Sequence, residues 1–324
     1  MRQQIFQINN PEEFKQLALQ VFRQQAEHNG VYRSFIQHLG VDPTCIQEIY
    51  QIPFLPVAFF KTHQVQTGTK EVQEIFTSSG TTGQITSRHY VADVKLYIQS
   101  FTQSFTQFYG PISDYVVLAL LPAYLERPGS SLVYMAKHLI EQSQQSESGF
   151  YLYNTQELKE QLQQLEHAGR KVLLLGVTFA LLDFAEACTM PLRHTIIMET
   201  GGMKGRRKEM LREEVHGVLQ QAFQMPAIHS EYGMTELLSQ AYSKGNGLFD
   251  TPPWMKILIC DVNDPMHIQA PGISGGINII DLANIDSCAF IATKDIGKIH
   301  PNGQFEVLGR FDNSDIRGCN LMVG

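Results

Sequence analysis

A stretch rich in hydroxyl groups and glycine, residues 77–83, is the first part of the sequence whose residue types could bind a ligand. It reads T-S-S-G-T-T-G and follows the apolar pair Ile75 and Phe76. Backbone N–H groups and hydroxyls in such a loop can converge on one phosphate, and glycine lets a ligand approach the backbone closely. The spacing is not that of a Walker A loop. The stretch therefore predicts a phosphate-binding loop, with a polar surface turn as the alternative.

A second candidate is the segment Y-G-M-T-E at residues 232–236, which follows a predicted strand ending near His229. It supplies an aromatic ring in Tyr232, a hydroxyl in Thr235 and a carboxylate in Glu236. Ligands of open α/β sheets gather at the carboxyl ends of strands, and Mg²⁺ prefers oxygen ligands and phosphate partners. The segment therefore indicates nucleotide or magnesium binding. The alternative is the start of a helix with Thr235 as its cap.

The remaining candidates are two charged residues near the end of the sequence and one segment that follows a predicted strand. Asp295, in T-K-D-I-G, follows a predicted strand and could hold a ribose diol; an aspartate in a turn before glycine is the alternative. Arg310 lies in the segment G-R-F-D after the last predicted strand. Residues 199–205 read E-T-G-G-M-K-G and form another junction between a strand and a loop.

Apolar runs and helical stripes alternate between residues 115 and 229, and they predict the elements that must position these candidates. Runs such as 115–121 are uninterrupted, as expected of strands buried on both faces. Alternating strands and helices indicate an α/β protein with a doubly wound, mainly parallel sheet. After about Gly245, short strands between turn residues indicate a smaller antiparallel β subdomain. The predicted strands are 115–121, 150–153, 172–175, 195–198, 227–229, 256–260, 277–281, 290–293 and 305–308; the predicted helices are 93–108, 130–140, 154–165, 179–187 and 211–223.

The first sixty residues are predicted to be helical and then irregular. Asn10 and Pro11 form a helix start, and apolar residues from Phe14 to Phe22 recur with helical spacing. A shorter helix is predicted at 31–39. Residues 52–60 are apolar but contain two prolines, so we predict buried irregular chain there instead of a central strand.

Composition and charge exclude several classes of protein. The 324 residues are 43% hydrophobic, enough for a large core, and the net charge of −7 makes a nucleic-acid partner unexpected. Five scattered cysteines suit a reducing compartment, and we expect those other than Cys319 to be buried. Because we find neither a signal peptide nor a long apolar run, we predict a cytoplasmic protein without a membrane span.

Together, these segments and their order resemble the adenylate-forming superfamily of acyl-CoA synthetases, peptide-synthetase adenylation domains and luciferases, from about Thr77 onward. The resemblance implies that ATP and Mg²⁺ are the cofactors. It implies that Tyr232 stacks on adenine, that Thr235 contacts the α-phosphate and that Glu236 binds Mg²⁺. Asp295 and Arg310 would hold the ribose and the neighbouring phosphate region. It also implies a phosphate loop at Ser78, Ser79, Gly80, Thr81, Thr82 and Gly83, and an adenine pocket that includes Gly201, Gly202, Met203, Gly233 and Met234.

The sequence departs from the superfamily pattern in two places. A basic residue usually follows the phosphate loop, and Thr86 stands there, with Arg88 two positions later. In the superfamily, the G-R-x-D segment leads into a C-terminal lid with a catalytic lysine, whereas this sequence runs to Gly324. We therefore expect a large domain at 1–308 without the lid and a hinge remnant and tail at 309–324. Lys204, Lys294 or Lys298 could replace the missing lysine.

These features together are most similar to the acyl-protein synthetase family of bacterial bioluminescence systems. That resemblance implies activation of a fatty or other carboxylic acid as acyl-AMP, followed by transfer to Cys319 in the segment R-G-C-N. A protein such as a reductase or a carrier would accept the acyl group afterwards. The alternatives are an acyl-CoA ligase of phenylacetate type and a non-catalytic nucleotide- or acyl-binding relative. For His89 and His229, near the candidate site, we expect structural roles, with a place in the pocket lining as the alternative.

Overall fold

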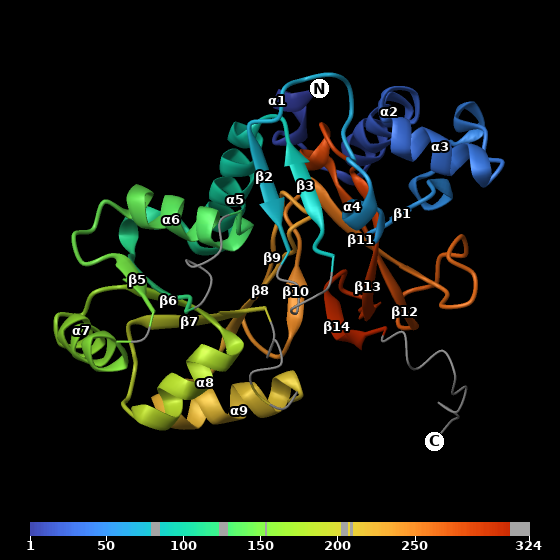
Figure 1. The fold of residues 1–324 in the computed structure, drawn as a ribbon. Helices are drawn as coiled ribbons and strands as arrows, with labels where there is room; N and C mark the ends of the chain where they lie inside the picture. The colour runs from blue at the N-terminus through green and yellow to red at the C-terminus, as the bar shows by residue number, and fades with distance from the viewer. Residues whose placement is uncertain (79–84, 123–128, 153, 202–206, 208–209, 312–324) are drawn as a thin grey trace.

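Five parallel strands form one half of the central sheet. A computed structural model describes residues 1–78, 85–122, 129–152, 154–201, 207 and 210–311. Every residue of the strands β4 and β6 is buried, because α8 and α9 cover one face of this half while α5 and α6 cover the other (Figure 1). The strand order from the edge inward is β5 (Gly149–Tyr151), β4 (Val116–Leu120), β6 (Val172–Val177), β7 (Thr195–Thr200) and β8 (His229–Tyr232). The helices are α5 (Val94–Tyr109), α6 (Ser131–Ser143), α7 (Thr155–His167), α8 (Thr178–Ala187) and α9 (Arg212–Phe223).

Antiparallel strands continue the same sheet beyond β8. Within the described residues they join the parallel strands in one sheet of twelve strands, in which β14 lies between β10 and β13. The α/β class with parallel and antiparallel strands confirms the predicted fold class, but the hydrogen bonding of both parts into one sheet was not predicted. These strands, in order from β8, are β9 (Ala241–Ser243), β10 (Leu248–Asp250), β14 (Phe305–Arg310), β13 (Phe290–Ile299), β12 (Ser274–Asp281) and β11 (Met255–Cys260).

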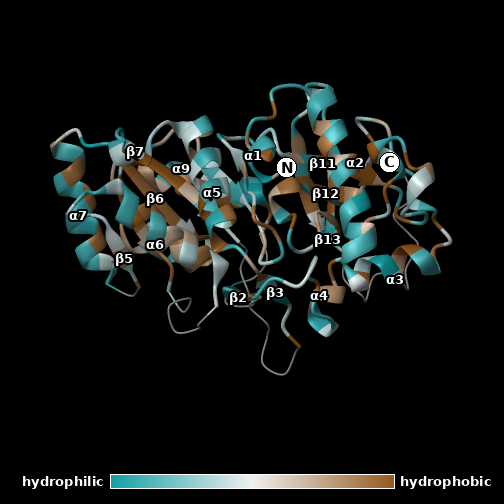
Figure 2. Cartoon of the chain, turned by 90° about the horizontal axis from the view of Figure 1, so that it is seen from above, coloured by the Kyte–Doolittle hydropathy of each residue, from teal (hydrophilic) through white to brown (hydrophobic). Residues whose placement is uncertain are grey.

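N-terminal helices cover one face of the antiparallel half. The Asn10 side chain accepts a hydrogen bond of 2.9 Å from the Glu13 N–H and so caps the long helix α2, as predicted. Phe290 of β13 packs against the rings of Phe22 and Tyr32, which lie on α2 and α3. In Figure 2 the hydrophobic strands of both halves lie against their helices. The N-terminal elements are α1 (Arg2–Ile5), α2 (Pro11–His28), α3 (Gly30–His38), the 3-10 helices Pro43–Cys45 and Ile49–Gln51, β1 (Leu55–Pro56), which pairs with β13, and α4 (Phe59–Thr62).

A separate two-stranded hairpin carries the stretch rich in hydroxyl groups and glycine. The strands β2 (Glu74–Thr77) and β3 (Arg88–Val91) pair antiparallel, with Thr77 opposite Arg88. The sequence predicted the connecting loop but not the hairpin. Two more 3-10 helices, Ile112–Asp114 and Leu282–Asn284 (η4), complete the described elements.

Several predictions need correction. Residues 235 and 236 form a turn, so the alternative of a helix that starts at Thr235 is wrong. Asp295 lies within β13 and not after it, because residues up to Ile299 continue to pair with β12 and β14. Cys45 is exposed, whereas Cys188, Cys260 and Cys288 are buried as expected. The last strand, β14, runs to Arg310, two residues longer than the predicted strand 305–308. Among the described helices, none is long and apolar enough to cross a membrane.

Candidate active site

Tyr232, Asp295 and Arg310 meet where the parallel half of the sheet joins the antiparallel half. The Tyr232 hydroxyl donates a buried hydrogen bond of 2.7 Å to Asp295 Oδ2, and Arg310 Nε lies 3.2 Å from Asp295 Oδ1. Asp295 and Arg310 face each other across β13 and β14. Burial raises the pKa of Asp295, although the Tyr232 hydroxyl and the Arg310 charge oppose this. The predicted ribose-binding pair and the predicted adenine-stacking residue are therefore brought together.

The Tyr232 ring is held by other aromatic rings. It packs edge-on against Phe305 of β14, with the centroids 5.5 Å apart, and against Phe249 of β10 at 6.0 Å. Its side chain is mostly buried. The ring is thus fixed at the end of β8, while its stacking on adenine stays a prediction.

Glu236 is a buried carboxyl group in the turn that follows Tyr232. Burial raises its pKa, and a hydrogen bond to Ser87 and the charges of Arg310 and Lys61 oppose this shift. A divalent cation would offset the cost of burying the charged form. In the part of the chain that the structure describes, no three His, Cys, Asp or Glu side chains group as a metal site. Glu236 therefore fits Mg²⁺ held by one carboxylate, with nucleotide phosphates and water as the other ligands.

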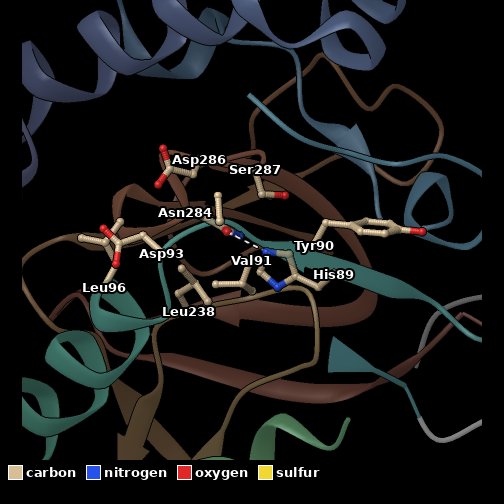
Figure 3. Close-up of a pocket in the computed structure, with 10 residues that line it drawn as sticks. His89, Tyr90, Val91, Asp93, Leu96, Leu238, Asn284, Asp286 and Ser287 are labelled. Carbon is tan, nitrogen blue, oxygen red and sulfur yellow. Dashed lines mark hydrogen bonds between the residues drawn. The ribbon is translucent and has the colours of Figure 1, made fainter. Parts of the chain in front are cut away.

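The turn at 235–236 is fixed by a buried histidine and asparagine. His89 Nδ1 lies 2.8 Å from the Thr235 carbonyl oxygen, and His89 Nε2 lies 2.9 Å from Asn284 Oδ1. Asn284 Nδ2 donates a hydrogen bond of 2.7 Å to the Glu236 carbonyl oxygen. Figure 3 shows the side chains of His89 and Asn284 facing each other. Burial lowers the pKa of His89 to about 4, although the contacts with Thr235 and Asn284 act in the opposite direction.

Two buried carboxyl groups, Glu199 and Glu231, lie at the ends of β7 and β8. Thr200 pairs in register with Glu231, and its hydroxyl donates a hydrogen bond to Glu231 Oε2. Burial, with a contribution from the Glu199 charge, raises the pKa of Glu231 to about 7. Burial acts in the same direction on Glu199, but His216 and Arg212 hold its pKa below the ordinary value. Glu199 is thus charged at neutral pH, whereas the pKa of Glu231 lies close to neutral pH.

The remaining predicted residues lie around these groups or outside the described part. Ser78 closes the neck of the hairpin, since its hydroxyl accepts a hydrogen bond of 2.9 Å from the Ser87 N–H. Gly201 has φ +74°, and its carbonyl oxygen accepts a hydrogen bond from Thr178. A Cβ on Gly233 would lie 2.5 Å from Glu231 Oε1, so a larger residue there would require the Glu231 side chain to move. Met234 is half-buried. The predictions for Ser79, Gly80, Thr81, Thr82, Gly83, Gly202, Met203, Lys204 and Cys319 fall outside the described residues.

The sequence analysis missed the groups that support the site. Glu231 directly precedes the segment Y-G-M-T-E, so its position at the strand end was available as a signal. Ser87 and Asn284 gave no signal, because nothing in their local sequence relates them to residues 235–236. His89 was expected to be structural, and its contacts with the turn are now visible.

Comparison with known proteins supports the resemblance. Residues 7–115 match the family model for acyl-protein synthetase, LuxE. A long-chain-fatty-acid–luciferin-component ligase of Vibrio harveyi is 22% identical over 91% of this chain and 83% of its own length. The corresponding ligase of Photorhabdus luminescens is 40% identical over 70 residues, which are 21% of this chain and 60% of that protein. The resemblance to acyl-protein synthetases is confirmed. The family match includes the N-terminal helices, whereas the motifs in the sequence supported the resemblance only from about Thr77 onward.

Solved structures show the same fold at low sequence identity. A 2-hydroxyisobutyryl-CoA ligase in complex with 2-HIB-AMP and CoA matches 93% of this chain and 70% of its own, with a TM-score of 0.64 and 12% identity. ATP-bound MatB from Rhodopseudomonas palustris matches 75% of this chain with a TM-score of 0.56 and 17% identity. The match covers 49% of the MatB chain, about half its length.

Proposed function

We propose that this protein uses ATP to activate a fatty or other carboxylic acid as an acyl-adenylate and then transfers the acyl group to a protein cysteine. The observation that carries the proposal is the meeting of Tyr232, Asp295 and Arg310 beside Glu236 at the ends of the central strands. These residues come from three separate segments of the motif pattern. The relatives named as long-chain fatty-acid ligases give the substrate class.

Each side chain of the site would have a distinct role. The Asp295 carboxylate accepts hydrogen bonds from the two ribose hydroxyls, and Tyr232 keeps that carboxylate in place. Arg310 is 73% exposed and has one described carboxylate partner, so its charge is available to a phosphate. The Thr235 hydroxyl donates to the α-phosphate. Mg²⁺ on Glu236, when bound, would neutralise charge on the phosphates.

The first step joins the acid to the nucleotide. A carboxylate oxygen of the substrate attacks the α-phosphorus, a new P–O bond forms, and the bond between the α-phosphorus and the oxygen that bridges it to the β-phosphate breaks. Pyrophosphate leaves with that electron pair. The charge that builds up on the phosphoryl oxygens is stabilised by Arg310 and Thr235, since fixed donors of this kind lower the barrier.

The second step moves the acyl group to sulfur. We assign the acceptor to Cys319, on the basis of its sequence context. Its thiolate attacks the carbonyl carbon, a C–S bond forms, the C–O bond to AMP breaks, and the thiol proton passes to solvent. A protein such as a reductase or a carrier would then take the acyl group. We place the reaction in the cytoplasm because a free acceptor thiol suits a reducing compartment.

ATP–pyrophosphate exchange with a panel of carboxylic acids tests the first step. We expect exchange with fatty acids. Exchange that yields acyl-CoA when CoA is added would favour the acyl-CoA ligase, and no exchange with any acid would favour a binding protein without catalysis.

The acceptor needs its own test. With ATP, Mg²⁺ and a labelled fatty acid, the protein should gain label that neutral hydroxylamine removes. Cys319→Ser should lose this label and still carry out exchange. Label that persists in Cys319→Ser would show that another residue is the acceptor.

A further inference from the structure

His89 connects two parts of the proposed site that are far apart in the sequence. Its ring lies on β3, in the hairpin that carries the candidate phosphate loop, and it is fully buried. One ring nitrogen contacts the Thr235 carbonyl, 146 residues away, and the other contacts Asn284, 195 residues away (Figure 3). Asn284 in turn holds the Glu236 carbonyl. The two side chains thus fix both carbonyl groups of the turn.

A second contact runs parallel to this one. Ser87 precedes His89 by two residues, so both side chains lie on the same side of an extended chain. The Ser87 side chain hydrogen-bonds the Glu236 carboxyl group, and its backbone pairs with Ser78 at the neck of the loop. The hairpin therefore contacts both the carboxyl group proposed for Mg²⁺ and the backbone beside it.

The segment that follows the turn is also held by side chains. Asp281 accepts hydrogen bonds from the Leu238 N–H at 2.8 Å and the Ser239 N–H at 3.0 Å. Residues 233–240 belong to neither a helix nor a strand, so these contacts replace the backbone ladder that would otherwise fix the chain. Asp281 and Asn284 both belong to the η4 region, which makes that region the support of the turn.

We propose that His89 and Asn284 are positioning residues that hold the Thr235–Glu236 turn against the β2–β3 hairpin. They keep the carboxyl group proposed for Mg²⁺ beside Ser87, at the neck of the hairpin. This inference rests on the proposed function. Misplacement of a reacting group by about 1 Å can cost roughly a hundredfold in rate, so a turn without a backbone ladder needs such a support.

Two substitutions of His89 separate its two contacts. Asparagine places its amide nitrogen where Nδ1 lies and keeps the contact with Thr235. Glutamine places its amide nitrogen where Nε2 lies and keeps the contact with Asn284. Asn284→Ala removes the link to the Glu236 carbonyl. Phe60→Leu is the matched control, because the Phe60 ring packs edge-on against His89 at 5.7 Å but makes no polar contact with the turn.

The measurement is steady-state ATP–pyrophosphate exchange, with separate KM values for Mg·ATP and the fatty acid. A lost hydrogen bond costs about 1 kcal/mol, so we expect the KM for Mg·ATP to rise roughly fivefold in His89→Asn, His89→Gln and Asn284→Ala. The KM for the fatty acid should stay unchanged. Because His89→Asn removes only the contact that acts through Asn284, the double variant His89→Asn/Asn284→Ala should raise the KM for Mg·ATP little beyond Asn284→Ala alone. Phe60→Leu should lower the melting temperature and leave both KM values unchanged.

Two results would overturn the inference in different ways. If the wild type exchanges but the three variants lower only kcat, as a loss of folded protein would, then His89 and Asn284 are structural and the proposed function stands. If the wild type exchanges with no acid at all, the proposed function fails and the inference fails with it.

Discussion

The two halves of the sheet contribute to the site in different ways. The parallel half supplies backbone loops at the strand ends, namely Gly201 and the segment 232–236, whereas the antiparallel half supplies Asp295 and Arg310 from within paired strands. The parallel half is covered by helices on both faces, and its strands are apolar. The comparison teaches that the parallel half places its site residues through turns held by side chains from elsewhere, whereas strand register sets the two paired side chains of the antiparallel half. The site therefore depends on the alignment of the halves.

The two halves also differ in what surrounds their buried glycines. In the antiparallel half, a Cβ on Gly275 would collide with the Cys260 carbonyl oxygen, and a Cβ on Gly297 would lie 2.5 Å from the Glu306 carbonyl oxygen. In the parallel half, a Cβ on Gly176 would meet the Leu181 side chain at 2.7 Å. A side chain can turn away, but a paired backbone cannot without breaking its ladder.

The largest expected effect on activity comes from the loop side of the comparison. Glu236→Ala should lower the rate of ATP–pyrophosphate exchange by roughly a hundredfold, or ~2.7 kcal/mol, because it removes the proposed magnesium carboxylate. Glu141→Ala is the control, since Glu141 is an exposed carboxylate of α6 that forms an ion pair with Lys137, and the exchange rate of this variant should match the wild type. An unchanged rate in Glu236→Ala would remove Glu236 from the site.

Glycine substitutions test the difference in packing. Gly275→Ala should lower the free energy of unfolding by ~3 kcal/mol, the upper range for overpacking, and Gly176→Ala by ~1 kcal/mol. Urea denaturation of both variants measures the two values. Equal losses would mean that the halves tolerate added volume alike.

The raised pKa of Glu231, at the end of β8 in the parallel half, predicts how stability depends on pH. Its pKa in the folded protein is about 7 against an ordinary 4.5, so between these values the folded state binds more protons than the unfolded state. The stability contributed by this group is therefore lost as the pH rises through this window, by up to ~1.4 kcal/mol for each pH unit. Glu231→Gln removes the titration and keeps an acceptor for Thr200.

The measurement is the free energy of unfolding of both proteins at pH 5 and pH 8. We expect Glu231→Gln to gain stability relative to the wild type as the pH rises. A constant difference between the two proteins would show that Glu231 has an ordinary pKa.

The smallest expected effect concerns the hydrogen bond that joins the halves. Tyr232→Phe removes the hydroxyl that donates to Asp295 and should cost about 1 kcal/mol of stability, together with a modest rise in the KM for ATP. Tyr109→Phe is the control, because its hydroxyl lies 3.2 Å from His229 at the start of β8. A rise in the KM for ATP in Tyr109→Phe as large as in Tyr232→Phe would argue against a specific role for the Tyr232 hydroxyl.

The sequence predicts the parallel half well and the antiparallel half less well. Uninterrupted apolar runs such as 172–175 identify strands directly, because both faces are buried. By contrast, the placement of β14 between β10 and β13 depends on pairing between distant segments, which local patterns do not encode. The same reason applies to the site: the segment Y-G-M-T-E is readable as a unit, but the contacts of His89 and Asn284 with it depend on the folded chain.

The position of β14 also bears on how the protein is made. A ribosome releases the chain from its N-terminus, and domains generally begin to fold in that order. β14 is the last strand in the described sequence, yet it lies in the interior of the sheet and bonds to both β10 and β13. The strands on either side of it therefore wait, with open edges, until residues 305–310 have been translated. We expect the nascent protein to expose these edges late in synthesis and to need protection from aggregation there.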